Sequence, residues 1–336
     1  MGKNITMKDV AMQLGVSTVT VSKALSDREG VSEAVRESVK HKADAMGYRY
    51  NSLGKSMKEG MNYNVGILVA EQFMHDSAFY SKMYQTLIKD LLLLNYFGIL
   101  EIIPDESERD LKLPLILQNS KVDGIIILGQ MSRSYIERIS SVQIPFIFLD
   151  FSDDHFQVDT IVSDSFYGSY ELTNYLISLG HKNIGFVGNQ SATTSIMDRY
   201  IGYYKALLQN KLNLNEEWII SDRDDKGKFL DLILPIHMPT AFVCNCDEIA
   251  YHFIQKLKKS GFRVPEDVSV VGYDNYIFAT ISTPKITTEE VNVEAMSEAA
   301  VQSIIKRIKH PSNEYSRKVI SGRIVFRDSA TPPTDK

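Results

Sequence analysis

The sequence contains few of the residues that stabilise secreted or fibrous proteins. Only two of its 336 residues are cysteines, Cys244 and Cys246, and a single residue separates them. Cysteines that close together seldom form a disulfide, so a secreted disulfide framework is excluded and a reducing compartment is predicted. The 19 glycines and 10 prolines are too few for a collagen-like or low-complexity chain.

Long apolar runs are also missing. The longest, residues 91–94 and 125–128, fall far short of the roughly 20 residues that a membrane-spanning helix needs. The N-terminus MGKNITMKDV has no apolar stretch after its charges, which argues against a signal peptide. We therefore expect a cytoplasmic protein of ordinary globular composition that does not enter a membrane.

Charge is distributed unevenly along the chain. Residues 1–60 hold ten Lys/Arg against seven Asp/Glu, a net charge of +3, whereas residues 61–336 hold 27 against 35, a net charge of −8. A small basic head on a large acidic body suggests that only the head binds a polyanion.

The head is predicted to form three short helices. Thr6 and Asp9 have capping-box spacing at the start of the first helix, and Gly15 follows its last apolar residue. Ser17 is a natural N-cap for a second helix over residues 18–26. A third helix, beginning at Ser32, has apolar residues spaced 4, 4 and 3 apart up to residue 46.

A helix, a tight turn with glycine and a short helix with small exposed residues are typical of a helix-turn-helix DNA-binding unit. Small side chains let the backbone enter the major groove, where Lys23 reaches a guanine edge or a phosphate. The spacing alone fits a three-helix packing module with solvated polar faces equally well.

The residues themselves favour the DNA-binding interpretation. MKDVAMQLGVSTVTVSKAL, followed by VSEAVRESVKHKADAMGYRYN, strongly resembles the N-terminus of the LacI/GalR family of bacterial transcription regulators. The resemblance implies that Thr18, Val19 and Lys23 read bases and that Ser17, Thr20 and Ser22 hold phosphates. The family usually has Arg where Lys23 stands, and Lys is a point donor rather than a bidentate fork.

The resemblance continues through the linker at residues 50–61. The family uses this stretch as a hinge helix that folds on DNA and wedges an apolar side chain into the minor groove, which kinks the duplex. Alignment on Asn51 places Met57 at the wedge. Gly54 stands where the family commonly has Ala, at a cost of about 1 kcal/mol of helix propensity. The alternative is a plain flexible linker.

The remainder of the chain alternates short β-branched apolar runs with helix-length amphipathic stretches. The runs are residues 65–70, 97–103, 123–128, 146–150, 184–188, 218–220, 241–245 and 268–274, and the helical stretches are near residues 79–95, 107–120, 132–141, 164–180, 199–212, 247–261 and 291–308. This alternation predicts parallel α/β sheets, and a break near residues 159–164 divides them into two doubly wound halves.

The family resemblance extends over this body almost to the chain end. It implies an α/β body of two Rossmann-like subdomains resembling a type I periplasmic sugar-binding protein. We expect a helix-turn-helix domain at 1–49 and an effector-binding and dimerisation domain at 62–336. The family's crossovers give an N-subdomain of 62–162 with 292–321 and a C-subdomain of 163–291 with 322–336.

Polar and aromatic side chains just past the strand ends are the candidates for holding a small polyhydroxyl ligand. They are Phe79, Tyr80, Asp150, Asn189, Arg199, Asp222, Arg223, Asn245, Asp247 and Asp274. By resemblance, Arg199 and Asp274 occupy positions with which the family grips effectors. Arg223 stands where some members have an aromatic residue, which favours a charged or larger ligand. An Asp after a strand is also a common helix N-cap, so Asp247 has a structural alternative.

Signatures of catalysis are absent: no GxSxG, GxGxxG, HExxH or GxxxxGK[ST] occurs, and no His pair has metal-ligand spacing. We expect no enzyme activity, no cofactor and no metal. A solute-binding protein or a sugar-converting enzyme with the same body are the alternatives.

The sequence is thus interpreted as a repressor of carbohydrate-utilisation genes that binds double-stranded operator DNA and responds to a saccharide. A palindromic site requires two heads, hence a homodimer. The polar tail after Phe326 lacks the heptads of a tetramerisation helix. Purine- or protein-corepressor control stays open, as does the sign of the response. Bound to DNA, the protein would lie with the bacterial nucleoid.

Overall fold

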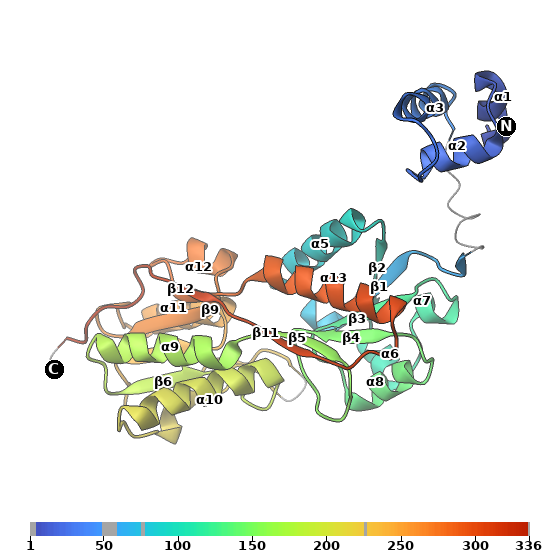
Figure 1. Ribbon diagram of the computed structural model, residues 1–336. Coiled ribbons are helices and arrows are strands. Elements are labelled where there is room, and N and C mark those ends of the chain that lie inside the picture. Colours follow the sequence, from blue (N-terminus) through green and yellow to red (C-terminus); the bar gives the residue numbers. More distant parts are fainter. Residues whose placement is uncertain (1–4, 49–58, 75–77, 225–226, 335–336) are drawn as a thin grey trace. The chain divides into compact units, whose positions relative to one another are not determined.

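The computed structural model describes residues 5–48, 59–74, 78–224 and 227–334. The chain forms two compact units, Met1–Asn62 and Tyr63–Lys336. The first contains three helices among its described residues, and the second contains two β-sheets with helices around them (Figure 1).

The head consists of α1 (Met7–Leu14), α2 (Thr18–Leu25) and α3 (Glu33–Ala45). The predicted capping box is present, since the Asp9 amide donates to Thr6 Oγ1 at 3.4 Å and the Thr6 amide donates to Asp9 Oδ2 at 2.8 Å. Gly15 ends α1 with a φ of 66°, a left-handed conformation that favours glycine. One small core holds the helices together: Val10, Ala11, Val21, Ala24, Val39 and Ala43.

Two six-stranded sheets form the body. The first is parallel, in the order β11-β5-β4-β3-β1-β2, and its strands are β1 (Asn64–Ala70), β2 (Phe97–Ile103), β3 (Gly124–Leu128), β4 (Phe146–Leu149), β5 (Asp159–Ser163) and β11 (Arg317–Ile320). The second has the order β12-β10-β9-β8-β6-β7, with β6 (Ile184–Val187), β7 (Ile219–Ile220), β8 (Ala241–Cys244), β9 (Ser269–Asp274), β10 (Thr287–Glu290) and β12 (Arg323–Val325). Only β12 runs antiparallel to its neighbour.

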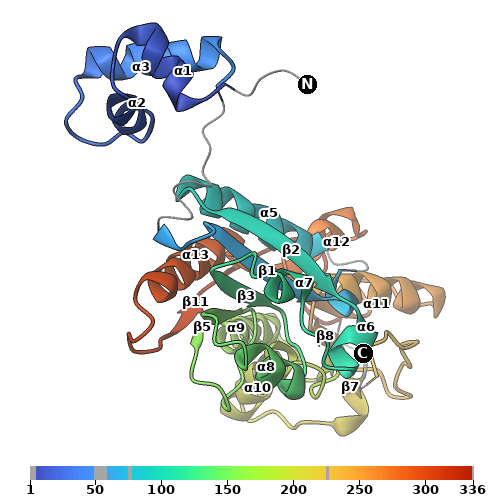
Figure 2. The same ribbon diagram turned by 90° about the vertical axis from the view of Figure 1, so that its right-hand side faces the viewer.

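Helices cover both sheets. The first is flanked by α5 (Ala78–Leu93), α6 (Asp105–Arg109), α7 (Leu115–Gln118), α8 (Arg133–Ser140) and α13 (Val293–Lys309), and 3₁₀ turns lie at Glu71–Phe73 and Glu216–Trp218. The second is flanked by α9 (Ser165–Ser178), α10 (Thr194–Gln209), α11 (Asp247–Lys259) and α12 (Ile277–Ile281). Figure 2 shows the same layers turned by 90°. Fully buried strands such as β3, with five buried residues, explain the apolar runs in the sequence.

The chain crosses between the two sheets three times. It leaves the first sheet after β5, enters the second through α9, returns from β10 through α13, and crosses again between β11 and β12. These three crossings are called the hinge below, and they lie side by side in the middle of the body (Figure 1).

Several elements differ from the sequence expectation. Residues 159–163, expected to be a break, form the buried strand β5, because a one-residue step into α9 carries the chain to the other sheet. The single helix expected over 107–120 is two short helices, separated where Leu111 has a φ of 55° and Pro114 precedes α7. The helix α10 starts at Thr194 rather than residue 199.

Candidate functional site

The exposed face of α2 carries the residues expected to contact DNA. Thr18 and Val19 are exposed, Val19 to 63 %, whereas Thr20, Ser22 and Lys23 are half-buried. Ser17 caps the helix, because its Oγ accepts from the Thr20 amide at 3.0 Å. This leaves small side chains along the accessible surface of a short helix, the shape that fits a major groove.

The expected hinge-helix residues, Asn51 and Met57, lie outside the described residues.

A cavity of about 410 Å³ lies in the body where the carboxyl ends of strands from both sheets meet. This volume falls within the ~300–1,000 Å³ typical of small-molecule sites. Eight of the ten expected effector residues line it: Phe79, Tyr80, Asp150, Arg199, Arg223, Asn245, Asp247 and Asp274. The first three belong to the half built on the first sheet and the other five to the half built on the second.

Arg199 is a firmly held cation of the cavity. Only 7 % of it is exposed, and its Nη1 donates to the Asn245 carbonyl at 2.5 Å. Its Nη2 lies 3.4 Å from Asp274 Oδ1, and the Tyr273 ring lies 3.8 Å from its Cζ. Contacts on three sides fix the guanidinium before any ligand arrives, which lowers the entropy cost of binding.

Two carboxylates from opposite halves interact electrostatically with this guanidinium. Asp150 accepts a hydrogen bond from the Tyr80 hydroxyl at 2.8 Å. Burial raises the pKa of Asp150, and Arg199 opposes the rise. Burial also raises the pKa of Asp274 to about 7, with Arg199 lowering it and Asp150 raising it further. These two carboxylates therefore offer more acceptor oxygens than Arg199 satisfies, which suits a ligand rich in hydroxyl donors.

Both carboxylates stand on strained backbone. The φ angles of Asp150 and Asp274 are 70° and 105°, in the region that L-residues seldom adopt. Such conformations cost on the order of 1–3 kcal/mol and concentrate at functional sites. Both residues stand at the ends of their strands and line the cavity.

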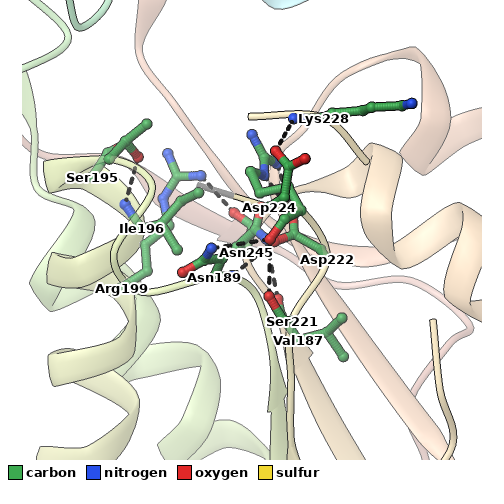
Figure 3. Close-up of polar contacts among 12 residues, drawn as sticks. Val187, Asn189, Ser195, Ile196, Arg199, Ser221, Asp222, Asp224, Lys228 and Asn245 are labelled. Carbon is green, nitrogen blue, oxygen red and sulfur yellow. Dashed lines mark hydrogen bonds and ion pairs between the residues drawn. The ribbon is translucent and has the colours of Figure 1, made fainter. Parts of the chain in front are cut away.

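Asp222 and Asn189 do not line the cavity but support it from behind (Figure 3). Asp222 is fully buried and accepts from the Asn189 amide at 2.7 Å and from Asn245 Nδ2 at 2.8 Å. It also binds Arg223 through Nε at 2.9 Å and Nη2 at 2.8 Å. The expected contact residue Asp222 is thus a hub that positions Asn245 and Arg223.

From the sequence, Arg223 is expected to favour a charged or larger ligand, and its pairing with Asp222 weakens the argument for a charged one. Its guanidinium is neutralised by Asp222, because Nε and Nη2 both contact the single oxygen Oδ2, and it lies over the Phe229 ring at 4.9 Å. Arg223 therefore presents the cavity with an ion pair and an aromatic neighbour rather than a free cation.

Asp247 is not a helix N-cap, the alternative role that the sequence left open for it. The N-cap of α11 is Cys246, and Asp247 is 1 % exposed, with Oδ2 accepting from the Tyr276 amide at 2.9 Å. Burial raises its pKa well above the ordinary value, and Oδ1 has no hydrogen-bond partner. A Cβ on Gly272 would overlap with Oδ1, so glycine is required beside it.

Sequence reasoning missed part of the lining: Gln72, Phe73, Asp105, Thr193, Ser195, Ile196, Lys228, Phe229, Glu248, Tyr276 and Phe278. Thr193 could have been found, because it is the N-cap of α10. Phe229 gives no signal, since it follows β7 in a segment with no regular periodicity.

Within the described residues, no group of three or more His, Cys, Asp or Glu could hold a metal ion. Over the same residues, no helix combines the length and apolarity required to cross a bilayer.

Two family models match the chain. The lacI family of bacterial regulatory proteins matches residues 6–51, and a periplasmic binding protein-like domain matches residues 173–330. The first covers the three helices of the head and the second covers most of the second sheet with its helices.

Relatives of similar length match nearly end to end. A ribose operon repressor of Haemophilus influenzae is 27 % identical over 328 residues, covering 96 % of this chain and 98 % of the relative. The HTH-type transcriptional repressor PurR of Vibrio parahaemolyticus is 29 % identical over 339 residues with the same coverage. Among solved structures, the lac repressor dimer bound to operator and an anti-inducer has a TM-score of 0.76 at 20 % identity, over 98 % of this chain and all of that one.

Proposed function

Because the chain belongs to the lacI family of bacterial regulatory proteins, we propose that it represses carbohydrate-utilisation genes and that a saccharide in the cavity controls its affinity for operator DNA. It is a DNA-binding transcription regulator with a helix-turn-helix head and an effector-binding body. One observation carries the proposal. Asp150 of one half and Arg199 and Asp274 of the other line the same cavity, so a ligand that binds all three would bridge both halves at once.

The chemistry of the cavity favours a saccharide over a purine. Vicinal hydroxyls donate to carboxylates and accept from a guanidinium fork, and aromatic rings such as Phe79 and Phe229 suit the C–H faces of a sugar. The ribose operon repressor supports this choice by name. The purine repressors among the relatives make a purine corepressor the second candidate, and the same aromatic rings would stack on its base.

On the DNA side, Thr18, Val19 and Lys23 would read base edges and Ser17, Thr20 and Ser22 would hold phosphates. Exposure of Thr18 and Val19 on α2 supports the first role. Asn51 and Met57 would complete the contact through the linker. We place the boundary of the head at residue 49 and that of the body at residue 62.

The protein would act as a homodimer. Sheet one ends at the edge strand β2, where Phe97 is 61 % exposed and Ile102 is also exposed. Beside it, the last turn of α5 and the residue after it expose Leu92, Leu93 and Leu94. An apolar edge of this kind is a liability unless a partner covers it, and a second copy, as in the lac repressor dimer, would do so.

The regulator would act by linkage rather than by turnover. A saccharide that stabilises one arrangement of the halves must change operator affinity by the same factor as operator changes saccharide affinity, typically 5–150-fold. We propose that the ligand is returned unchanged, that the protein is no enzyme, and that it works in the bacterial cytoplasm on the nucleoid.

A thermal-shift screen tests the proposal. The full-length protein and its Arg199→Met variant are heated with mono- and disaccharides and with purines. A ligand that binds only the native state raises Tm, by RT ln(1 + [L]/Kd), about 2.7 kcal/mol at 100-fold excess over Kd. A saccharide that shifts wild type alone supports the proposal. A shift by a purine alone replaces it with the second candidate, and silence of the whole panel contradicts both.

A further inference from the structure

A buried acid lies at the hinge, outside the cavity. Glu289 of β10 is 2 % exposed, and its Cα pairs with Tyr273 on one side and Ile324 on the other. Its Oε2 has no hydrogen-bond partner, and neither has Ser169 Oγ on α9, which packs over the same strands. Burying a carboxylate without partners is costly when it is charged and far less so when it is neutral.

The side chain lies against the first and the third crossing, since a Cβ on Gly168 of α9 would lie 2.8 Å from Glu289 Cγ. In the third crossing, a Cβ on Gly322 would lie 2.5 Å from Glu289 Oε1, so only glycine allows this approach. In the first, Asp164 separates β5 from α9, and its carbonyl accepts from the hydroxyl of Tyr273, the neighbour of Glu289 in the ladder, at 3.2 Å. The second begins at Glu290, the next residue.

The charges around Glu289 are mostly of its own sign. Asp164 and Glu171 face it from α9 and Glu290 from β10, while Arg199 of α10 is the opposing cation. Arg323 of β12 is occupied, because its Nε donates to Glu290 Oε2 at 2.5 Å. Burial, followed by Glu171, Asp164 and Glu290, raises the pKa of Glu289 from 4.5 to about 7.

We propose that Glu289 is a proton-linked switch of the hinge. Neutral, it lets α9, β10 and the β11–β12 crossing pack together as they do here. Ionised, it draws water between them and favours arrangements in which the two halves are less tightly held. The inference rests on the proposed function only in assuming that effector binding changes the arrangement of the two halves. It adds the proton as a second signal that changes this arrangement.

The sign follows from the acid being neutral in the packed state. That state binds a proton up to about pH 7, whereas a solvated Glu289 loses it near pH 4.5. The equilibrium constant for opening the hinge therefore increases as pH rises between these values. Well above pH 7 it no longer changes with pH. From pH 6 to pH 8 the opening equilibrium rises by up to about tenfold, from 1.36 kcal/mol per pKa unit.

Hydrogen–deuterium exchange of the full-length protein, without DNA or effector, tests the switch. The peptides compared cover residues 163–170, 287–293 and 318–325, with β3 (Gly124–Leu128) and β8 (Ala241–Cys244) as internal references. Wild type is compared with Glu289→Gln at the same pD, so the intrinsic pH dependence of exchange cancels. Glu137→Gln, on an exposed position of α8, is the matched control.

We expect the ratio of exchange rates, wild type over Glu289→Gln, to rise up to tenfold in the three hinge peptides between pD 6 and pD 8. It should stay constant in β3 and β8. Equal ratios at both pD values would overturn the proposal, and so would a rise shared by β3 and β8, which indicates global destabilisation. If Glu289→Gln does not fold, the exchange rate of the three hinge peptides is divided by that of β3 in wild type alone. A rise of this ratio between pD 6 and pD 8 supports the proposal, and a constant ratio overturns it. Because no effector is used, either outcome leaves the saccharide screen independent.

Discussion

The hub Asp222 offers the sharpest test of how the cavity is built. In Asp222→Asn the side chain keeps its size and one carbonyl oxygen, which still accepts from the Asn189 amide. It loses the charge opposite Arg223, whose side chain is 14 % exposed, and it turns an amide donor toward two other donors, Arg223 and Asn245 Nδ2. Removing one partner of a buried ion pair costs about 3–5 kcal/mol.

This loss should appear in the free energy of unfolding measured by urea denaturation. It corresponds to a fall in Tm of roughly 6–20 °C, at about 2–4 °C per kcal/mol for a unit of this size. Asp154→Asn, a change of the same kind at an exposed position, should leave Tm within about 1–2 °C, since surface substitutions are usually within 0.5 kcal/mol.

A double-mutant cycle isolates the pair. Arg223→Gln removes the charge that Asp222→Asn leaves uncompensated, so the double variant should recover about 1–3 kcal/mol relative to the sum of the single losses. If Asp222→Asn costs less than 1 kcal/mol, or if the two losses simply add, then Asp222 and Arg223 do not form the ion pair that we describe. The hub would then be an incidental contact.

Four further outcomes are expected. Lys23→Ala should weaken specific operator binding by about 1–3 kcal/mol in a fluorescence titration with the fold intact, and unchanged affinity would exclude a base or phosphate contact. Arg199→Met should abolish the saccharide-induced Tm shift while operator binding persists; a normal shift would place the ligand elsewhere. Asp274→Asn should flatten the stability–pH profile, because the raised pKa of Asp274 makes wild type lose stability as pH rises from 3.8 to about 7. Phe97→Asp should convert the dimer to monomer in analytical ultracentrifugation, and a stable dimer would show that β2 is not the interface.

Local signals in the sequence were sufficient for the head. Thr6, Gly15 and Ser17 each act within four residues, so caps and turns could be predicted without knowing the tertiary fold, and the structure confirms them. The buried strands of the body that consist of apolar runs, such as β1 and β3, could also be predicted. The strands β10, β11 and β12 were not predicted. The sequence of β10, TTEE, carries no apolar pattern and forms a strand only beside β9.

The cavity was predicted in part for a related reason. Residues at or directly after the end of a strand, such as Asp274 and Asp150, could be found because strand ends in a parallel sheet converge. Asp222 also follows a strand, yet it points behind the cavity, and only the side-chain geometry distinguishes the two cases. Glu289 reads as a surface residue in sequence, since its burial depends on α9 covering it.

The three crossings also set the order in which the body can be completed during synthesis. The edge of β5 is covered by β11, and 154 positions separate Ser163 from Arg317. At ~5–20 residues per second, a ribosome needs roughly 8–30 s to supply that strand. Until then the first sheet lacks both its sixth strand and α13, while the second sheet, apart from β12, is already synthesised. The half that begins first therefore stays incomplete for most of synthesis, until α13 and β11 are made shortly before β12 completes the second sheet, and its nascent form is the one that a chaperone would meet for longest.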